Sequence, residues 1–191
     1  MLSDYLKLNS RTDHDSIESK VDLVKLASHP DQYIKLIKSF LGYYSSIENT
    51  FLKFEEEFSQ LGINLKDRLK KNLLIADIKH FGVTEEDIKK LPIATDVPAM
   101  SNIHEAMGVL YVLEGSTMGG QIIFKQLIKS NIIGPDSAGG NFFKPYGAAT
   151  MPMWLSFKDS LNKLSNDKNE LVLKKARETF NTMEAWLIKT I

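Results

Sequence analysis

The chain has 191 residues, 24 basic and 24 acidic side chains, no formal net charge and no cysteine. This length predicts one domain with a complete hydrophobic core. The balanced charge argues against nucleic acid as a partner, and the missing cysteines exclude disulfides, thiolate metal sites and catalytic thiols. No apolar run reaches the ~20 residues of a membrane span, and no secretory signal is evident, so we expect a cytoplasmic protein without a membrane partner.

In the first half of the chain, apolar residues recur at spacings of three and four and predict helices over residues 10–27, 32–61, 65–81 and 85–90. The pair Ser10 and Asp13 is close to a capping box for the first helix. Gly62 and Gly82 close the second and third helices. The second helix carries an inward stripe of large apolar residues: Tyr33, Ile37, Phe40, Tyr44, Ile47, Phe51, Phe54 and Phe58.

In the second half, an irregular loop over 92–98 precedes a helix predicted over 103–128, with Ser101 as its cap. Glycine and proline make 134–147 a loop with short turns, and helices resume over 153–164 and 170–188. No stretch shows the alternation of a strand. The pattern predicts an all-α fold of six to eight helices, forming a single domain over residues 1–191.

Four glycines interrupt the helix predicted over 103–128: Gly108, Gly115, Gly119 and Gly120. Each costs roughly 1 kcal/mol relative to alanine inside a helix, so together they cost on the order of 3–4 kcal/mol. Two explanations fit, namely a closely packed second helix or a large flat ligand above bare backbone. Gly115 and Gly119 suffice for a helix crossing, whereas Gly120 and Ser116 make the bare patch broader. The residues alone leave both explanations open.

His14 lies on the apolar face of its predicted helix together with Ile17, Val21 and Val24. A core histidine bonded to a carbonyl is the more frequent situation, but a neutral imidazole is also the usual nitrogen ligand of haem iron. Lys7, two turns earlier, is within reach of an anionic group on a ligand bound at His14. The other histidines, His29, His80 and His104, fit surface or capping positions. No Glu-x-x-His pair for a di-metal site and no Gly-x-Ser-x-Gly nucleophile elbow occurs.

Several segments resemble the bacterial haem oxygenases, particularly those found with bacterial phytochromes. Residues 110–120 (LYVLEGSTMGG) resemble the distal-helix motif of that family, with Met118 in place of the usual leucine. Residues 11–18 (RTDHDSIE) resemble its proximal segment. Later blocks match in order: 142–147 (FFKPYG), Trp154, Phe157 and 176–180 (ARETF). The similarity spans most of the chain.

The resemblance implies an enzyme in which haem b is both cofactor and substrate, held between two helices. His14 would ligate the iron, and the distal wall would consist of Gly115, Ser116, Thr117, Gly119 and Gly120. Lys7 and Lys158 would pair with the haem propionates, while Phe143 and Phe180 would form pocket walls. Dioxygen and electrons from a ferredoxin, flavodoxin or reductase would open the ring to biliverdin, releasing iron and carbon monoxide. A bilin-accepting phytochrome is a further expected partner.

One departure affects proton delivery, because animal-type enzymes carry an aspartate at the position of Ser116. A serine hydroxyl can donate and accept a hydrogen bond but holds no negative charge. Ser116, Thr117, the main chain or more distant waters must therefore deliver the proton. Two alternatives remain: a protein that binds or transfers haem or a bilin without turnover, and a partner-binding bundle in which the glycines only pack helices.

Overall fold

The computed structural model describes residues 1–191, with the side chain at position 166 excepted, and contains α-helices and short 3-10 helices but no strand among the described residues. The all-α prediction is confirmed. The expected six to eight helices were too few, because ten α-helices are present. Their bounds are α1 Leu2–Asn9, α2 Arg11–Lys20, α3 Leu23–Leu26, α4 Pro30–Phe51, α5 Glu55–Gln60, α6 Lys71–His80, α7 Glu85–Lys89, α8 Ile103–Lys129, α9 Thr150–Leu161 and α10 Asn169–Thr190.

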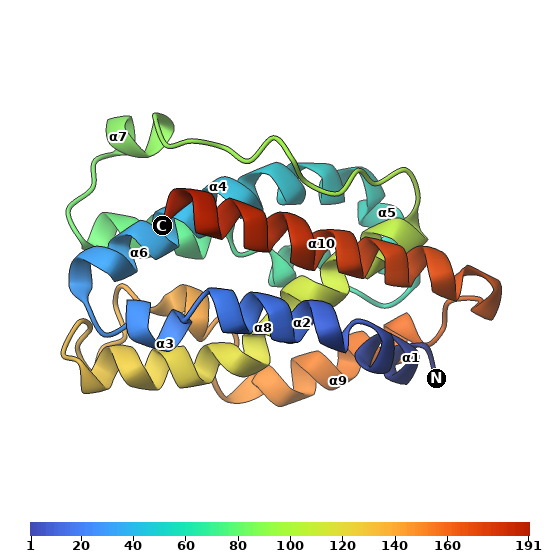
Figure 1. The fold of residues 1–191 in the computed structure, drawn as a ribbon. Coiled ribbons are helices and arrows are strands. Elements are labelled where there is room, and N and C mark those ends of the chain that lie inside the picture. The colour runs from blue at the N-terminus through green and yellow to red at the C-terminus, as the bar shows by residue number, and fades with distance from the viewer.

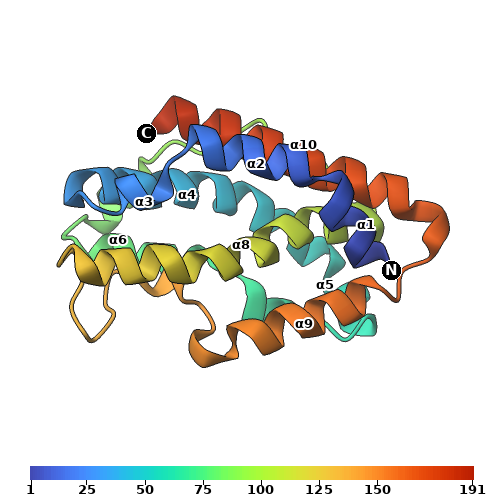
Figure 2. The same cartoon turned by 60° about the horizontal axis from the view of Figure 1, so that its bottom comes forward.

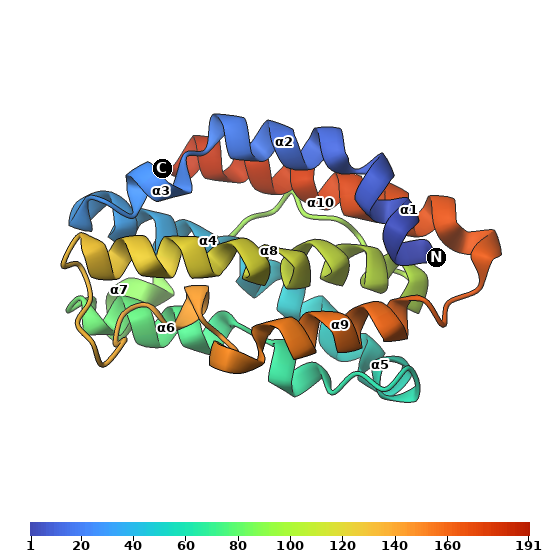
Figure 3. The ribbon, with the colours of Figure 1, turned by 90° about the horizontal axis from the view of Figure 1, so that it is seen from below.

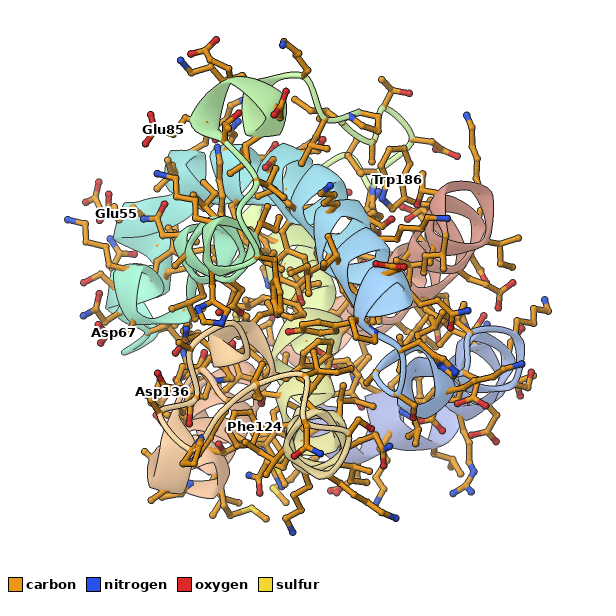
Figure 4. The ribbon with its side chains drawn as sticks, turned by 90° about the vertical axis from the view of Figure 1, so that its left-hand side faces the viewer. Glu55, Asp67, Glu85, Phe124, Asp136 and Trp186 are labelled. Atoms are coloured by element: carbon orange, nitrogen blue, oxygen red, sulfur yellow. The ribbon has the colours of Figure 1, made fainter. Side chains whose placement is uncertain are left out.

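The long helices α4, α8 and α10 form the centre of the molecule, and the others pack around them (Figure 1). The last helix, α10, packs along α8 and also against α2 and α4. Figure 3 shows α2 and α10 side by side, with α8 crossing the middle and α9 beyond it. Trp186 of α10, labelled in Figure 4, donates a hydrogen bond of 2.7 Å to the carbonyl of Ser39 in α4. No helix in the described part of the chain is long and apolar enough to cross a membrane.

The aromatic stripe of α4 forms much of the core, and all eight residues predicted to face inward are buried. The single helix predicted over 32–61 was wrong, because α4 ends at Phe51 and a 3-10 turn over Leu52–Phe54 precedes α5. A 3-10 helix has three residues per turn, so residues three apart lie on the same side. Phe51 and Phe54 therefore stay on the buried side, and Phe58 joins them from α5.

The predicted helix over 10–27 is divided in two, and an additional helix, α1, precedes it. Ser10 is the N-cap of α2, but its hydroxyl donates to the Leu6 carbonyl of α1 (2.8 Å) and makes no capping bond, so the capping box was wrong. Val21 is extended and ends α2. The Asp22 carboxylate then accepts the Lys25 N–H at 2.9 Å and starts α3.

The helix predicted over 65–81 was wrong in its first part, because Leu65–Arg68 form a 3-10 helix and α6 begins at Lys71, whereas α8, α9 and α10 lie within three residues of their predicted boundaries. Gly62 and Gly82 follow α5 and α6 with φ of 82° and 79°, the left-handed region that favours glycine after a helix. The N-cap of α8 is Asn102 and not Ser101. Its side-chain oxygen accepts the Glu105 N–H at 3.1 Å, while the Glu105 carboxylate accepts the Ser101 N–H at 2.6 Å.

The glycines of α8 have two different surroundings. A Cβ atom on Gly108 would lie 2.4 Å from the Val172 carbonyl oxygen of α10, and one on Gly120 would lie 2.8 Å from the Phe143 carbonyl oxygen. These two glycines permit close packing against neighbouring backbone. In contrast, a Cβ on Gly119 would meet nothing within 4 Å, and one on Gly115 would make an ordinary contact of 3.7 Å with Trp154. Helix packing therefore explains Gly108 and Gly120 but not Gly119.

Gly108→Ala and Gly119→Ala should change the free energy of unfolding in opposite directions. Both substitutions remove a helical glycine, which stabilises by up to about 1 kcal/mol. At Gly108 the new methyl group also collides with main chain, and such overpacking costs typically about 1–3 kcal/mol. Chemical denaturation of the purified variants measures both effects. Equal shifts for the two variants would contradict the division of these glycines into packing and open positions.

Candidate functional site

A pocket of about 750 Å³ lies between the N-terminal helices α1–α3 and the glycine-bearing part of α8. Helices α4, α9 and α10 and the segment containing Phe142 and Phe143 complete its wall. Figure 2 shows α2 and α8 on opposite sides of this region, with α10 running beside α2. The volume lies within the range typical of sites for small molecules and cofactors. All ten residues that the sequence selects line it: Lys7, His14, Gly115, Ser116, Thr117, Gly119, Gly120, Phe143, Lys158 and Phe180.

His14 presents its imidazole from α2 to this pocket, and half of its side-chain surface is exposed. It is therefore not a core histidine. Its Nδ1 atom lies 3.5 Å from an Asp15 carboxylate oxygen and 3.6 Å from one of Glu18. The edge of the imidazole packs against Phe180, with 5.7 Å between the ring centroids. With Nδ1 facing two carboxylates, Nε2 is the ring nitrogen suited to bind a ligand, and carboxylates beside Nδ1 increase the basicity of such a nitrogen.

The other three histidines do not line the pocket. His29 is the N-cap residue of α4, His80 ends α6 and His104 lies in the first turn of α8. The interpretation of these residues as surface or capping histidines agrees with their positions.

Polar contacts to α10 hold α2 in place, since α2 itself has no buried residue. Glu184 of α10 accepts hydrogen bonds of 2.7 Å from both the Ser16 hydroxyl and the Lys20 ammonium. Arg177 of α10 bonds the Asn9 carbonyl at 2.6 Å and forms an ion pair with Asp13 at 3.4 Å. The neighbouring Lys20 and Ser16 groups lower the pKa of Glu184, which keeps it ionised at neutral pH. These contacts fix the side of α2 opposite the pocket and leave the side that carries His14 free for a ligand.

The distal segment of α8 presents bare backbone at Gly119 and Gly115. Gly119 is exposed with open space above it, and Gly115 has only Trp154 at contact distance. Gly120 was expected to widen the same bare patch, and that interpretation is wrong in one respect, since the space beside its Cα is taken by the Phe143 main chain. Gly120 instead sets how closely Phe143 approaches the pocket.

The hydroxyl groups of the distal segment bond to their own helix. Ser116 donates to the Leu113 carbonyl at 2.8 Å, and Thr117 donates to the Glu114 carbonyl at 2.7 Å. Ser116 and Thr117 therefore present lone pairs rather than protons to their other neighbours. Burial raises the pKa of the pocket-lining Tyr44 above its usual value, and the neighbouring Ser116 hydroxyl lowers it in part, so the Tyr44 phenol keeps its proton at neutral pH.

Two lysines and several aromatic rings line other parts of the pocket. Lys7 is exposed in the last turn of α1, and the Lys158 ammonium of α9 lies 5.7 Å from the centroid of the Trp154 ring. Phe143 packs against Phe40, Phe142 and Tyr33. Asp77, which is fully buried, holds this segment by accepting the main-chain N–H groups of Asn141 at 3.0 Å and of Phe142 at 2.8 Å.

Sequence reasoning missed several residues that shape the pocket, among them three aromatic residues and one buried acid. Tyr44, Phe40 and Phe142 line it but were assigned only to the core or left without a role. Glu114 was read as part of a motif, although it is a buried carboxylate that contacts Arg68, Lys70 and Tyr146. The sequence contains a pattern that could have identified Glu114, namely a single acid directly after the apolar run 109–113. A buried acid in such a position needs a partner.

The comparisons with known proteins concern the family and the fold of the chain. The sequence-family model described as "Heme oxygenase" matches residues 1–189. No curated protein sequence matches the chain. Among solved structures, the heme oxygenase of Neisseria meningitidis, in its NO- and CO-bound forms, has a TM-score of 0.83 and 22% identity, covering 100% of this chain and 92% of that one.

Two further solved structures share the fold. The heme oxygenase of Leptospira interrogans has a TM-score of 0.79 and 17% identity, and the match covers 98% of each chain. The heme oxygenase-1 of the cyanobacterium Synechocystis, in complex with heme, has the same TM-score and identity, covering 98% of this chain and 91% of that one. With the family match over nearly its whole length, this chain belongs to the haem oxygenase family and is a haem-degrading oxygenase for which haem is both substrate and cofactor.

Proposed function

We propose that this enzyme binds haem between His14 and the Gly115–Gly119 segment and converts it to biliverdin, with release of iron and carbon monoxide. The observation that carries the proposal is the pairing of a half-exposed imidazole on α2 with bare backbone on α8 across one pocket of about 750 Å³. Close helix packing leaves no space above a glycine, as at Gly108, whereas Gly119 has nothing within 4 Å.

His14 is the proposed iron ligand through Nε2. Its Nδ1 atom lies 3.5 Å from an Asp15 carboxylate oxygen and 3.6 Å from one of Glu18, so these negative charges favour a proton on Nδ1 and leave the lone pair on Nε2. The contact with Phe180 sets the plane of the ring. The bonds from Ser16 and Lys20 to Glu184 keep the helix from moving away when a ligand enters.

When bound, haem supplies the iron that takes up dioxygen and the ring that is oxidised. The distal backbone is bare at Gly119, where a bound haem would find room for dioxygen, and Gly115 and Trp154 bound that space. Because the Ser116 and Thr117 protons are directed to main-chain carbonyls, we assign Tyr44 as the pocket group that donates a proton, directly or through water. Ser116 then serves as an acceptor that orients the donor. Tyr44 would thus supply the proton in a site that has no equivalent of the aspartate of animal-type enzymes.

Lys7 and Lys158 approach the pocket from α1 and α9, which is the arrangement needed to pair with two propionates. An exposed pair of this kind contributes at most about 1 kcal/mol, so its main effect is to fix the rotation of the ring. A ferredoxin, flavodoxin or reductase as electron donor and a phytochrome as bilin acceptor stay predictions. The cytoplasmic location and the action of residues 1–191 as one domain stay predictions as well.

Replacing His14 tests the ligand assignment. His14→Ala should remove the proximal ligand and change the absorption spectrum of the ferric haem complex, and added imidazole should restore it in part because it fills the space left. His80→Ala, which alters an exposed histidine outside the pocket, is the control and should leave the spectrum unchanged. If the His14→Ala spectrum equals that of the unaltered protein, the assignment is wrong.

Gly119→Leu tests the purpose of the bare backbone. The isobutyl group enters open space, so the protein should fold, but it occupies the volume above the ring. Turnover in an aerobic assay with a chemical reductant should fall by at least about tenfold, equivalent to about 1.4 kcal/mol of activation free energy. Haem affinity, measured by anaerobic titration, should change less than turnover. Equal losses of affinity and turnover would show that Gly119 acts only in haem binding, and full activity would show that it does not face the ring.

A further inference from the structure

The buried ion cluster of Arg68, Lys70, Glu114 and Tyr146 lies directly beside the distal segment. Glu114 has no exposed surface and immediately precedes Gly115 in α8. One carboxylate oxygen accepts hydrogen bonds of 2.7 Å from the Lys70 ammonium and from the Tyr146 hydroxyl, and the other contacts the Arg68 guanidinium. By contrast, Glu55, Asp67 and Glu85 lie at the outer surface, where water solvates their charge (Figure 4).

The cluster holds two cations around one carboxylate. The nearby buried Glu48 supplies a second negative charge, and its carboxylate accepts the main-chain N–H groups of Lys70 and Lys71 at 2.5 and 3.1 Å. Burial raises the pKa of Glu48, and these N–H groups and the two lysine charges lower it in part. The Arg68 Nε–H is buried without an acceptor among the described residues. Packing alone does not account for this set, since buried ion pairs contribute little net stability compared with apolar residues of similar size.

Two observations connect the cluster to the pocket. Lys70 itself lines the pocket, although only 2% of its side-chain surface is exposed. The charges of Glu114 and Glu48 both contribute to the raised pKa of Tyr44, which faces the same pocket. Arg68 also contacts the Met153 carbonyl of α9 at 3.4 Å. The cluster therefore links α8 next to Gly115 with α9 next to Trp154. The charges of the cluster therefore lie close to the distal side of the pocket.

We propose that the Arg68–Lys70–Glu114–Tyr146 cluster is a positioning device for the distal side of the haem pocket, holding α8 in place at Gly115 and setting the electrostatic potential there through the opposed charges of its two cations and Glu114. This inference rests on the proposed function. Each cation favours, and each carboxylate disfavours, negative charge at the ligand position opposite His14, and a low-dielectric surrounding makes both effects stronger. Arg68, Glu114 and Tyr146 do not line the pocket, so these three residues act through the position of Gly115 and through charge.

Charge-neutralising variants test the electrostatic effect of the cluster. The measured quantity is the pH midpoint of the change in the ferric haem spectrum that occurs when the sixth ligand of the iron loses a proton. Glu114→Gln removes a negative charge and should lower the midpoint, while Lys70→Met removes a positive charge and should raise it. Each shift should be roughly half a unit to one unit, the size that a unit charge about 15 Å away produces at an effective dielectric constant of about 20. The double variant should return toward the original midpoint.

Glu85→Gln is the matched control, because it removes the same charge from an exposed ion pair with Lys79 at 2.5 Å, far from the pocket lining. Its midpoint should stay unchanged. A merely structural cluster would give shifts of the same sign in both single variants or none, and either result overturns the proposal. If the unaltered protein fails to bind haem, the proposed function fails, whereas normal binding without opposite shifts refutes the electrostatic effect alone.

Tyr146→Phe tests positioning without changing any charge, and it remains available if Glu114→Gln does not fold. Removing this donor should leave the midpoint in place but loosen Glu114, so the amide hydrogens of residues 115–119 should exchange with solvent severalfold faster in the haem-free protein. Exchange at the N-terminal turn of α8, held by Asn102 and Glu105, should be unaffected. Unchanged exchange at 115–119 would overturn the positioning role.

Discussion

The site depends on one helix meeting different neighbours along its length. At Gly108 and Gly120, α8 approaches the main chain of other segments so closely that no side chain fits, and this fixes its position against α10 and Phe143. Between them, Gly119 stays open to the pocket and Gly115 touches only Trp154. The same residue type therefore anchors the helix at two points and leaves it bare beside the pocket, where we propose that haem binds. Close packing at two glycines and open backbone at the others explain why α8 carries glycines that lower its helix stability.

The polar contacts divide into two groups with different tasks. On the proximal side, Glu184 and Arg177 of α10 hold α2 through exposed or half-buried contacts, for which water competes. On the distal side, Glu114 is held by fully buried charges, and removing one partner of such a set typically costs about 3–5 kcal/mol. The buried contacts therefore hold the distal segment of α8 more firmly than the exposed contacts hold α2.

The sequence predicted the class of the fold and the members of the pocket because both depend on local patterns. Helical spacing of apolar residues placed the stripe from Tyr33 to Phe58, and the motif around Gly115 located the distal wall. The breaks at Val21 and Leu52 escaped prediction, since they depend on the Asp22 cap and on a 3-10 turn that preserves the same buried side. The task of Gly120 depends on the long-range approach of Phe143 and could not be read from spacing. The partners of Glu114 lie 44 and 46 residues away in the chain and were likewise invisible.

The central claim is that His14 and the Gly115–Gly119 backbone face one haem from opposite sides. A crystal structure of the ferric haem complex tests it most directly. The account predicts a bond from His14 Nε2 to the iron, with the Gly115–Gly119 backbone over the other face and no side chain between it and the ring. Iron ligation by another residue, or a ring bound away from this segment of α8, would contradict it.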